Sequence, residues 1–170
     1  AQLLAEGNLI AWFQGKSEFG PRALGARSFL ADPRRDEIRE EMNEKIKKRE
    51  LFRPFAPSTL ESSCSDFFDL EQTSPYMNIV ATVKDDRIPA ITHVDKTARV
   101  HTVCSTENPR YYDLIDAFGK LTGIPVLLNT SFNIQEPIVY SPEDALKTFS
   151  ISGVDALVIG NYVVTREDLN

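Results

Sequence analysis

The sequence predicts an α/β fold with α+β character, in which helices pack on a twisted mixed β-sheet. Apolar runs of strand length alternate with three stretches that carry helix start and stop signals. Several neighbouring strand candidates have no helix between them, which argues against a strictly alternating parallel sheet. The 170 residues are 42% hydrophobic and include ten phenylalanines, enough for one core. We therefore expect a single domain over residues 1–170.

The strand candidates are short and rich in apolar or β-branched residues. A Gly160-Asn161 pair between the last two candidates predicts a tight hairpin turn. Two prolines in residues 53–62 exclude a helix interior there and leave that segment extended. The expected strands are residues 8–13, 27–31, 76–84, 98–103, 125–129 and two more within 156–165.

The first helix is expected over residues 33–48. Asp32 suits an N-cap and Pro33 the first helical position. Ile38, Met42 and Ile46 then recur every four residues, which predicts one apolar face.

Two further helices carry clearer end signals. Asn108 before Pro109 predicts the start of the second helix, and Gly123 predicts its end. Ser141 opens the third helix, which runs to about residue 152, and Asp144 stands near the N3 position of a capping box.

The net charge of −6, from 19 basic and 25 acidic residues, argues against a protein that holds nucleic acid through its overall field. The charge is unevenly distributed. Residues 16–53 contain eleven Lys/Arg against eight Asp/Glu, so this segment is at +3 and the remainder at −9. A basic pocket on an acidic body suits a small anionic ligand.

The two cysteines, Cys64 and Cys104, form no CxxC pair or framework, which favours two reduced thiols in a cytoplasmic protein over one disulfide. No apolar run approaches the roughly 20 residues of a membrane span, so we expect no membrane contact. The chain begins without Met, as a piece of a longer polypeptide would.

Residues 14–28, QGKSEFGPRALGARS, combine three glycines with two arginines. Glycine permits positive φ or a close approach of main chain to a ligand. Arg22 and Arg27 can each present a two-pronged donor to phosphate or carboxylate oxygens. The spacing is neither a P-loop nor a GxGxxG fingerprint. An anion site and a tight connection whose arginines pair with surface acids both fit this segment.

A second group of cations, Lys47, Lys48 and Arg49, falls at the predicted end of the first helix, and Arg53 follows it. The helix dipole favours cations at the C-terminal end of a helix, and this effect alone would explain the three cations there. The functional interpretation requires Lys47, Arg49 and Arg53 to share a cleft with Arg22.

Polar residues follow the strand PVLL, where α/β proteins place ligands. Asn129, Ser131 and Asn133 can hydrogen-bond phosphate and carbonyl oxygens, and an ordinary Asx or Ser/Thr turn explains them equally well. Arg99 is a further candidate anion ligand. His93 and His101 lack metal-ligand spacing, so we expect no metal site in this chain.

Taken together, five blocks resemble the C-terminal domain of the O-carbamoyltransferases of antibiotic and nodulation-factor biosynthesis. They match that family in order along nearly the whole chain. The blocks are QGKSEFGPRALGARSFLADP, NEKIKKRELFRPFAPS, ITHVDKTARVHTV, NPRYYDLIDAFGKLTGIPVLLNTSFN and EPIVYSPEDAL.

The resemblance implies a YrdC-like fold that binds carbamoyl phosphate and ATP, with Mg²⁺ on the nucleotide, and forms carbamoyl-adenylate. It also implies an N-terminal Kae1-like, iron-containing domain of the same polypeptide, absent here, that passes the carbamoyl group to an acceptor hydroxyl. The chain is thus expected to be part of a transferase. The acceptor and the oligomeric state, a homodimer included, stay open.

Carried over by position, Arg22 lies in the family's EFGPRALG block, and Lys47 with Arg49 forms its K-x-R pair. Arg99 falls in the HVD-x-TAR block, and Ser131 with Asn133 in NTSFN. We expect Lys47, Arg22, Arg99 and Ser131 to act in catalysis, and the others to bind substrate or nucleotide. The second set comprises Arg49, Arg53, Arg27, Asn129 and Asn133.

The chain departs from the family pattern at three places. Lys96 stands where glycine is expected and Ala26 where asparagine is common, and FNIQEP lacks the usual glycine before Glu-Pro. These departures concern loop shape more than reaction class.

Two other functions stay open from the sequence. Some YrdC-like proteins bind RNA, although the acidic balance and the lack of aromatic residues interleaved with the basic ones weigh against it. The second alternative is a non-catalytic domain that docks on its partner domain and stabilises it.

Overall fold

The structure is a computed structural model that describes residues 1–50 and 52–169. Across these residues the chain forms one eight-stranded sheet, in the order β4-β5-β3-β6-β2-β1-β7-β8. β1 pairs parallel with β7, and β3 with β5; the other neighbours pair antiparallel. The predicted mixed sheet is confirmed. The strands are β1 (Ile10–Phe13), β2 (Arg27–Ala31), β3 (Ala56–Leu60), β4 (Ile79–Thr82), β5 (Thr97–Val103), β6 (Val126–Ser131), β7 (Ala156–Ile159) and β8 (Tyr162–Thr165).

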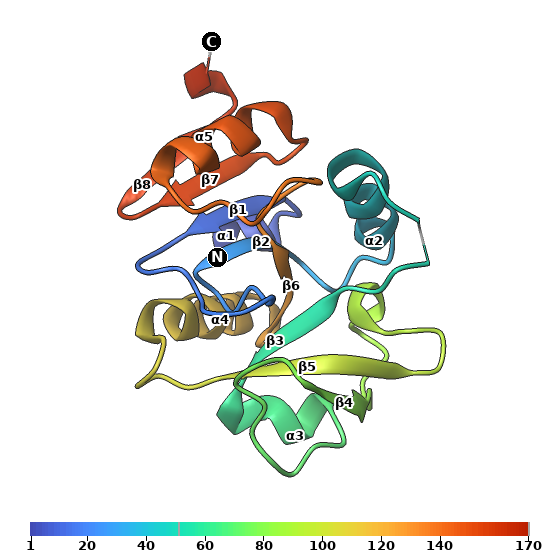
Figure 1. Ribbon diagram of the computed structural model, residues 1–170. Helices are drawn as coiled ribbons and strands as arrows, with labels where there is room; N and C mark the ends of the chain where they lie inside the picture. Colours follow the sequence, from blue (N-terminus) through green and yellow to red (C-terminus); the bar gives the residue numbers. More distant parts are fainter. Residues whose placement is uncertain (51, 170) are drawn as a thin grey trace.

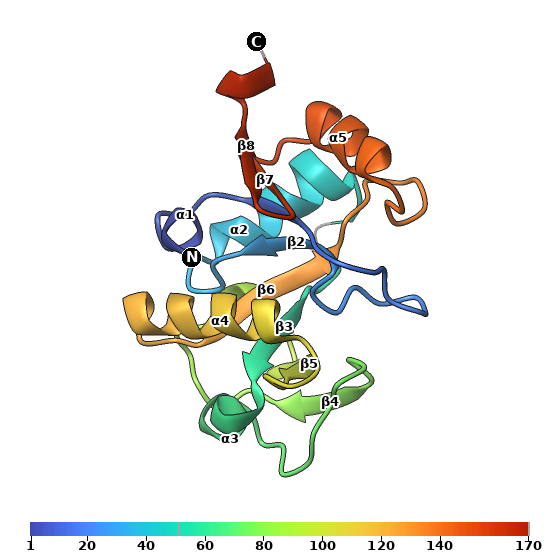
Figure 2. The ribbon, with the colours of Figure 1, turned by 90° about the vertical axis from the view of Figure 1, so that its left-hand side faces the viewer.

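Helices cover both faces of the sheet (Figures 1 and 2). α1 and α4 pack on one face around Tyr111 and Phe118, and α2, η1 and α5 contribute to the core on the other face. The α-helices are α1 (Gln2–Ala5), α2 (Glu37–Glu41), α3 (Cys64–Phe67), α4 (Pro109–Thr122) and α5 (Pro142–Ile151). A π-helix, η1 (Met42–Lys47), and three short 3₁₀ turns, η2 (Glu61–Ser63), η3 (Pro89–Ile91) and η4 (Glu167–Leu169), complete the set.

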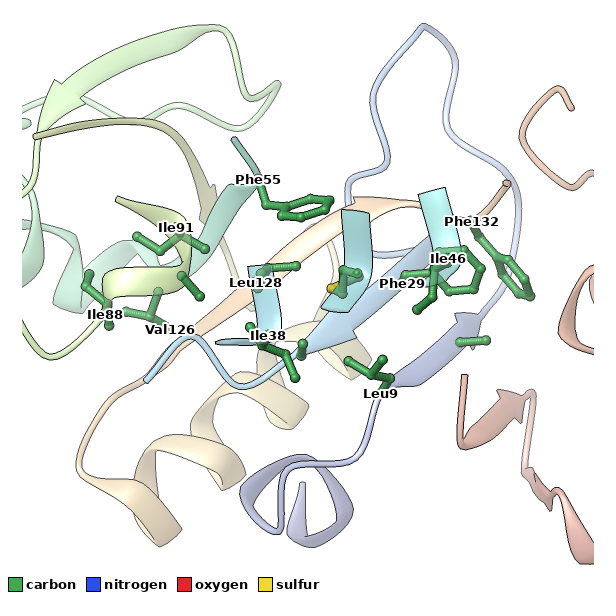
Figure 3. Packing of buried hydrophobic residues seen from close by; sticks show 14 of the residues in the cluster. Leu9, Phe29, Ile38, Ile46, Phe55, Ile88, Ile91, Val126, Leu128 and Phe132 are labelled. Carbon is green, nitrogen blue, oxygen red and sulfur yellow. The ribbon is translucent and has the colours of Figure 1, made fainter. Parts of the chain in front are cut away.

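The larger apolar core lies beneath α2 and η1 (Figure 3). Ile38 and Ile46 are fully buried, which confirms the apolar face predicted for this helix. The Phe29 and Phe132 rings pack with centroids 4.7 Å apart, joining β2 to the segment after β6. Burying one such side chain contributes about 1.5–3 kcal/mol, so this packing fixes the segment after β6 against β2.

The ends of α4 and α5 are as predicted. The Asn108 side chain accepts a hydrogen bond from the Tyr111 N–H, and Gly123 ends α4 at φ +76°. At α5, Ser141 and Asp144 form the reciprocal capping box.

The first helix differs from its prediction at both ends. It begins at Glu37, because the Asp32 carboxylate is engaged by the backbone N–H and guanidinium of Arg34. From Met42 onward the chain continues as a π-helix to Lys47. Lys48, at φ +48°, ends it. Lys47 is thereby buried beside the core, with 5% of its surface exposed.

Several strand ends also differ from the prediction, and β1 begins at Ile10 where residue 8 was expected. β4 is shorter than predicted, because Met77 adopts φ +52°, which an extended strand cannot contain. β6 is longer than predicted and runs to Ser131, because Ser28 to Ala31 of β2 pair with it. Ser131 therefore belongs to the strand that already contained Asn129, and not to a loop.

Lys96, which stands where the resemblance leads us to expect glycine, adopts φ +61° in the turn before β5. A left-handed conformation costs a side chain-bearing residue roughly 1–2 kcal/mol. We expect Lys96→Gly to raise the free energy of unfolding by about 0.5–1 kcal/mol in urea denaturation. Lys96→Ala keeps the Cβ and should bring no gain. Equal effects of the two changes would contradict backbone strain as the cause.

Candidate functional site

The loop between β1 and β2, residues 14–26, requires its glycines. Gly15, Gly20 and Gly25 have φ values of +54°, +125° and +92°, as predicted from the sequence. Gly25 also packs directly on α4. A Cβ there would lie 2.1 Å from the Tyr111 ring, so this position excludes any side chain.

Glu18 holds the same loop from within. Its carboxylate accepts hydrogen bonds from the backbone N–H groups of Leu24 and Ala26, at 2.6 and 2.8 Å. These hydrogen bonds join the first half of the loop, which contains Glu18, to the second half, which contains Leu24 and Ala26. Arg22 lies at the tip of the loop between the two halves. Sequence reasoning did not single out Glu18, although it is the only acid in residues 14–28.

The tip of this loop borders a cavity of about 280 Å³. Its walls come from the loop, the segment after η1, and strands β3, β5 and β6. The cavity therefore brings together residues far apart in the chain. The predicted site residues that line it are Arg22, Arg49, Arg53, Arg99, Asn129 and Ser131.

The four arginines of this cavity have no carboxylate in contact with them among the described residues. In the described part of the chain, none of Arg22, Arg49, Arg53 and Arg99 forms an ion pair with a carboxylate. Arg49 donates from Nε to the Asn43 side-chain oxygen at 2.6 Å, so its charge is oriented but not balanced. Arginines of a surface network normally have carboxylate partners, whereas four guanidiniums around one hollow without such partners suit a polyanionic ligand.

The arginines also repel one another. Burial, and then the neighbouring charge of Arg53, lower the pKa of Arg49 to about 10. Burial and the charge of Arg22 lower the pKa of Arg99. An anion in the cavity would relieve this repulsion, because it favours the charged form of each group.

Lys47 lies behind the cavity wall and not on it. Its ammonium donates to the backbone oxygens of Ser131 and Asn133 at 2.6 and 2.8 Å. It also reaches the side-chain oxygen of Asn133 at 2.9 Å and that of Ser131 at 3.3 Å. Burial, followed by the charge of Arg49, lowers the pKa of Lys47 to about 7. The structure thus places Lys47 where it holds the end of β6.

Arg27 is outside the cavity, although we expected it to bind a ligand there. Its guanidinium donates to the carbonyls of Gln14 and Gly15 at 2.9 and 3.0 Å and lies 3.5 Å above the Phe13 ring. The two Nη groups are occupied because β2 turns the buried side chain under the base of the loop, and the buried Nε has no hydrogen-bond partner among the described residues. Arg27 therefore anchors the loop.

The two asparagines have different places. Asn129 lines the cavity, and its amide donates to the carbonyl of Ala23 and the hydroxyl of Ser58, at 3.0 and 2.9 Å. Asn133 lies beyond the wall, where its oxygen accepts from the Ser131 hydroxyl at 2.6 Å. Asn129 thereby ties the loop tip to β6, and Asn133 orients Ser131.

His101 lies beneath this layer, in a buried polar cluster that sequence reasoning missed. Its Nδ1 is 2.8 Å from the Ser58 hydroxyl, and its ring stacks on Tyr111 with centroids 6.2 Å apart. Burial lowers the pKa of His101 to about 4. The alternation of β5 could have shown that His101 shares a sheet face with Arg99.

This pKa predicts a loss of stability in acid. Between pH 6.5 and pH 4 the unfolded chain binds a proton at His101 that the folded chain does not, so stability falls as the pH falls. The loss at full development is on the order of 3 kcal/mol. Urea denaturation of wild type and His101→Gln at several pH values measures this loss of stability. The carboxylates titrate alike in the two proteins, so their contribution cancels in the difference between the two free energies of unfolding. Parallel pH profiles for the two proteins would contradict the assignment.

The described residues contain neither a cluster of metal ligands nor a membrane-spanning helix. No group of three or more His, Cys, Asp or Glu side chains there is placed to hold a metal ion. No helix of that same part is long and apolar enough to cross a membrane.

Comparisons with known proteins show the family to which the chain belongs. The nodulation protein NolO of Bradyrhizobium diazoefficiens is 51% identical over 173 residues, covering 98% of this chain and 32% of NolO. The 3'-hydroxymethylcephem-O-carbamoyltransferase of Amycolatopsis lactamdurans is 38% identical over 167 residues, covering 97% of this chain and 32% of that enzyme. The chain thus spans about a third of the length of these relatives.

A solved structure shares the fold. HypF in its phosphate- and nucleotide-bound form matches 93% of this chain and 20% of its own, with a TM-score of 0.63 and 20% sequence identity. A family model described as carbamoyltransferase C-terminus matches residues 1–166. The chain therefore belongs to the carbamoyltransferase C-terminus family and corresponds to the C-terminal part of longer relatives.

Proposed function

We propose that this chain binds carbamoyl phosphate and ATP, with Mg²⁺ on the nucleotide, and forms carbamoyl-adenylate. The observation that carries the proposal is the cavity lined by Arg22, Arg49, Arg53 and Arg99, none of which pairs with a carboxylate of the described chain. A triphosphate and an acyl phosphate together supply the negative charge that these groups lack.

The reaction needs such a cavity. Water cleaves carbamoyl phosphate to carbamate and phosphate; a carbamate oxygen then attacks the α-phosphorus of ATP, and pyrophosphate leaves. Both the nucleophile and its target are anionic, so repulsion blocks the attack unless cations neutralise the phosphates. The four arginines serve this purpose, and no protein side chain has to act as a covalent nucleophile.

Ser131 contributes a hydroxyl and the end of β6 to the cavity wall. The Lys47 ammonium and the Asn133 oxygen both contact that hydroxyl. We assign Ser131 to the carbamoyl or α-phosphate end of the substrates, with Lys47 holding it in place. Lys47 adds positive charge behind the wall only while it is protonated.

The pocket that binds the acceptor substrate belongs to the remainder of the protein. The relatives are about three times as long as this chain, and an N-terminal Kae1-like domain of the same polypeptide would pass the carbamoyl group onward.

Calorimetry and isotope exchange test the proposal. We expect heat of binding with ATP, and exchange of pyrophosphate into ATP that requires carbamoyl phosphate. Binding with no exchange would contradict the adenylate-forming step. The absence of heat with either ligand would favour a domain that only docks on its partner.

A further inference from the structure

The segment between β6 and α5 (Figure 1) follows directly on the candidate site and contains an acid that the proposed function does not use. Glu136 is exposed, yet its carboxylate accepts three hydrogen bonds. Oε1 accepts from the Ile134 N–H and the Thr148 hydroxyl, and Oε2 from the Gln135 N–H, each at 3.0 Å. Thr148 is buried on α5. The carboxylate therefore joins the turn after β6 to a helix that packs on the core.

The same hydrogen bonds keep Glu136 ionised. Partial burial of the carboxyl group acts against its charge. The backbone N–H groups of the turn and the Thr148 hydroxyl outweigh that effect and lower the pKa of Glu136. The side chain therefore carries its negative charge throughout the neutral pH range, beside residues that belong to the candidate site.

The turn that Glu136 holds also orients Asn133. The backbone carbonyl of Glu136 accepts a hydrogen bond from Nδ2 of Asn133 at 2.6 Å. An amide whose nitrogen is bound in this way presents its oxygen on the other side. That oxygen accepts from the Ser131 hydroxyl at 2.6 Å and from the Lys47 ammonium at 2.9 Å. The reversed amide would direct its N–H groups at a cation, so the turn decides how Asn133 meets both donors.

Glu136 also affects the charge of Lys47. That side chain is buried and, among the described residues, forms no ion pair with a carboxylate. Burial, and then the charge of Arg49, lower the pKa of Lys47 to about 7; Arg53 adds to this effect and Glu136 opposes it. Of the charged groups that act on Lys47, Glu136 is thus the one that favours the ammonium form.

We propose that Glu136 is a positioning residue of the candidate site. It acts through Asn133, whose oxygen it directs at the Ser131 hydroxyl and the Lys47 ammonium. Glu136 itself does not line the arginine-lined cavity, so it touches no substrate there. The inference rests on the proposed function, because it presumes the parts that Ser131 and Lys47 have in that reaction.

Glu136→Gln tests the inference, and Glu143→Gln is the matched control. Glu143 is an exposed acid in the first turn of α5, so each variant loses one negative charge from the same region of the protein. Glu136→Asp keeps the charge on a shorter side chain and is the conservative variant. Because Glu136 is exposed, we expect all three variants to fold, which urea denaturation checks.

The first measurement needs no ligand. NMR titration of protein with isotope-labelled lysine side chains follows Lys47, whose signal is identified by its absence from Lys47→Met. In Glu136→Gln we expect the midpoint of this titration to lie about 0.2–0.7 pH unit below that of wild type, because the neighbouring arginines then act unopposed. Glu143→Gln should leave the midpoint unchanged, and Glu136→Asp should restore most of the difference.

The second measurement is carbamoyl phosphate-dependent ATP–pyrophosphate exchange. In wild type, kcat/KM for ATP should fall as the pH rises through about 7, because Lys47 loses its proton. In Glu136→Gln we expect this fall at lower pH, displaced by the same amount as the NMR midpoint. On the acid side of the fall, kcat should be about three- to tenfold below wild type and KM for ATP within about twofold, since the four arginines are unchanged.

A Lys47 midpoint that stays in place in Glu136→Gln would overturn the inference, even if that variant were less stable, because Glu136 would then have a purely structural part. An equal displacement in Glu143→Gln would overturn it as well. Wild type without exchange would reject the proposed function. In that case a midpoint displaced only in Glu136→Gln would still show that Glu136 acts on Lys47.

Discussion

Arg99→Ala is expected to lower carbamoyl phosphate-dependent ATP–pyrophosphate exchange by about 30- to 1,000-fold. This corresponds to a loss of about 2–4 kcal/mol of transition-state stabilisation, the cost of one charge-assisted contact to a developing or concentrated negative charge. The expectation is large because Arg99 is half-buried and no carboxylate of the described chain neutralises it.

Two variants define the cause of this loss. Arg99→Lys keeps the charge but not the planar two-pronged donor, so its exchange rate should fall between those of wild type and Arg99→Ala. Arg35→Ala removes an exposed arginine that contacts the carbonyl of Gly7 and lies outside the cavity, and it should leave exchange unchanged. Equal losses in Arg35→Ala and Arg99→Ala would show a general effect of net charge.

Gly25→Ala is expected to reduce the free energy of unfolding by about 2–5 kcal/mol. Two costs combine at this position. The φ of +92° strains any residue with a Cβ, and the new methyl group would lie 2.1 Å from the ring of Tyr111. Tyr111 is completely buried against α4 and the sheet, so the ring cannot move aside without disturbing the core.

Gly15→Ala is the matched control, measured alongside Gly25→Ala by urea denaturation. Gly15 has φ +54° and no atom within 4 Å of the added Cβ, so only the backbone cost of about 1–2 kcal/mol remains. Similar losses at the two glycines would mean that the contact with Tyr111 contributes nothing to the requirement for glycine at 25.

The prediction of the fold was accurate where short-range chemistry determines structure. The cap at Asn108, the stop at Gly123 and the capping box at Ser141 each depend on residues within four positions. The hairpin between β7 and β8 likewise turns at Gly160-Asn161, with Gly160 at φ +58°. Such signals are complete within one turn of chain, so the sequence alone contains them.

The first helix shows where this reasoning stops. Asp32 carries the sequence of an N-cap, yet its carboxylate is taken by Arg34. The apolar residues Ile38 and Ile46 are buried as predicted, but the π-helical turn that buries Lys47 after them follows from packing against β2 and the end of β6. Periodicity cannot distinguish an α-helical from a π-helical continuation.

The candidate site was predicted as a set of residues and not as an arrangement. Arg22, Arg49, Arg53 and Arg99 do share one cavity, as the functional interpretation required. Arg27 was predicted to bind the ligand for the same reason as Arg22, but its guanidinium lies outside the cavity. The difference arises because Arg27 begins β2, whose pleat turns the side chain beneath the loop.

Glycine positions, caps, turns and the excess of unbalanced cations in residues 16–53 are properties of the sequence by itself, because each depends on neighbouring residues. Only the tertiary structure decided which of those cations face one cavity. It also decided that Lys47 contacts Ser131 from behind the cavity wall, that Glu18 holds the loop between β1 and β2, and that His101 is buried beside Ser58. The physical reason is that sheet order and strand register bring β3, β5 and β6 together, and these depend on the burial of the whole core.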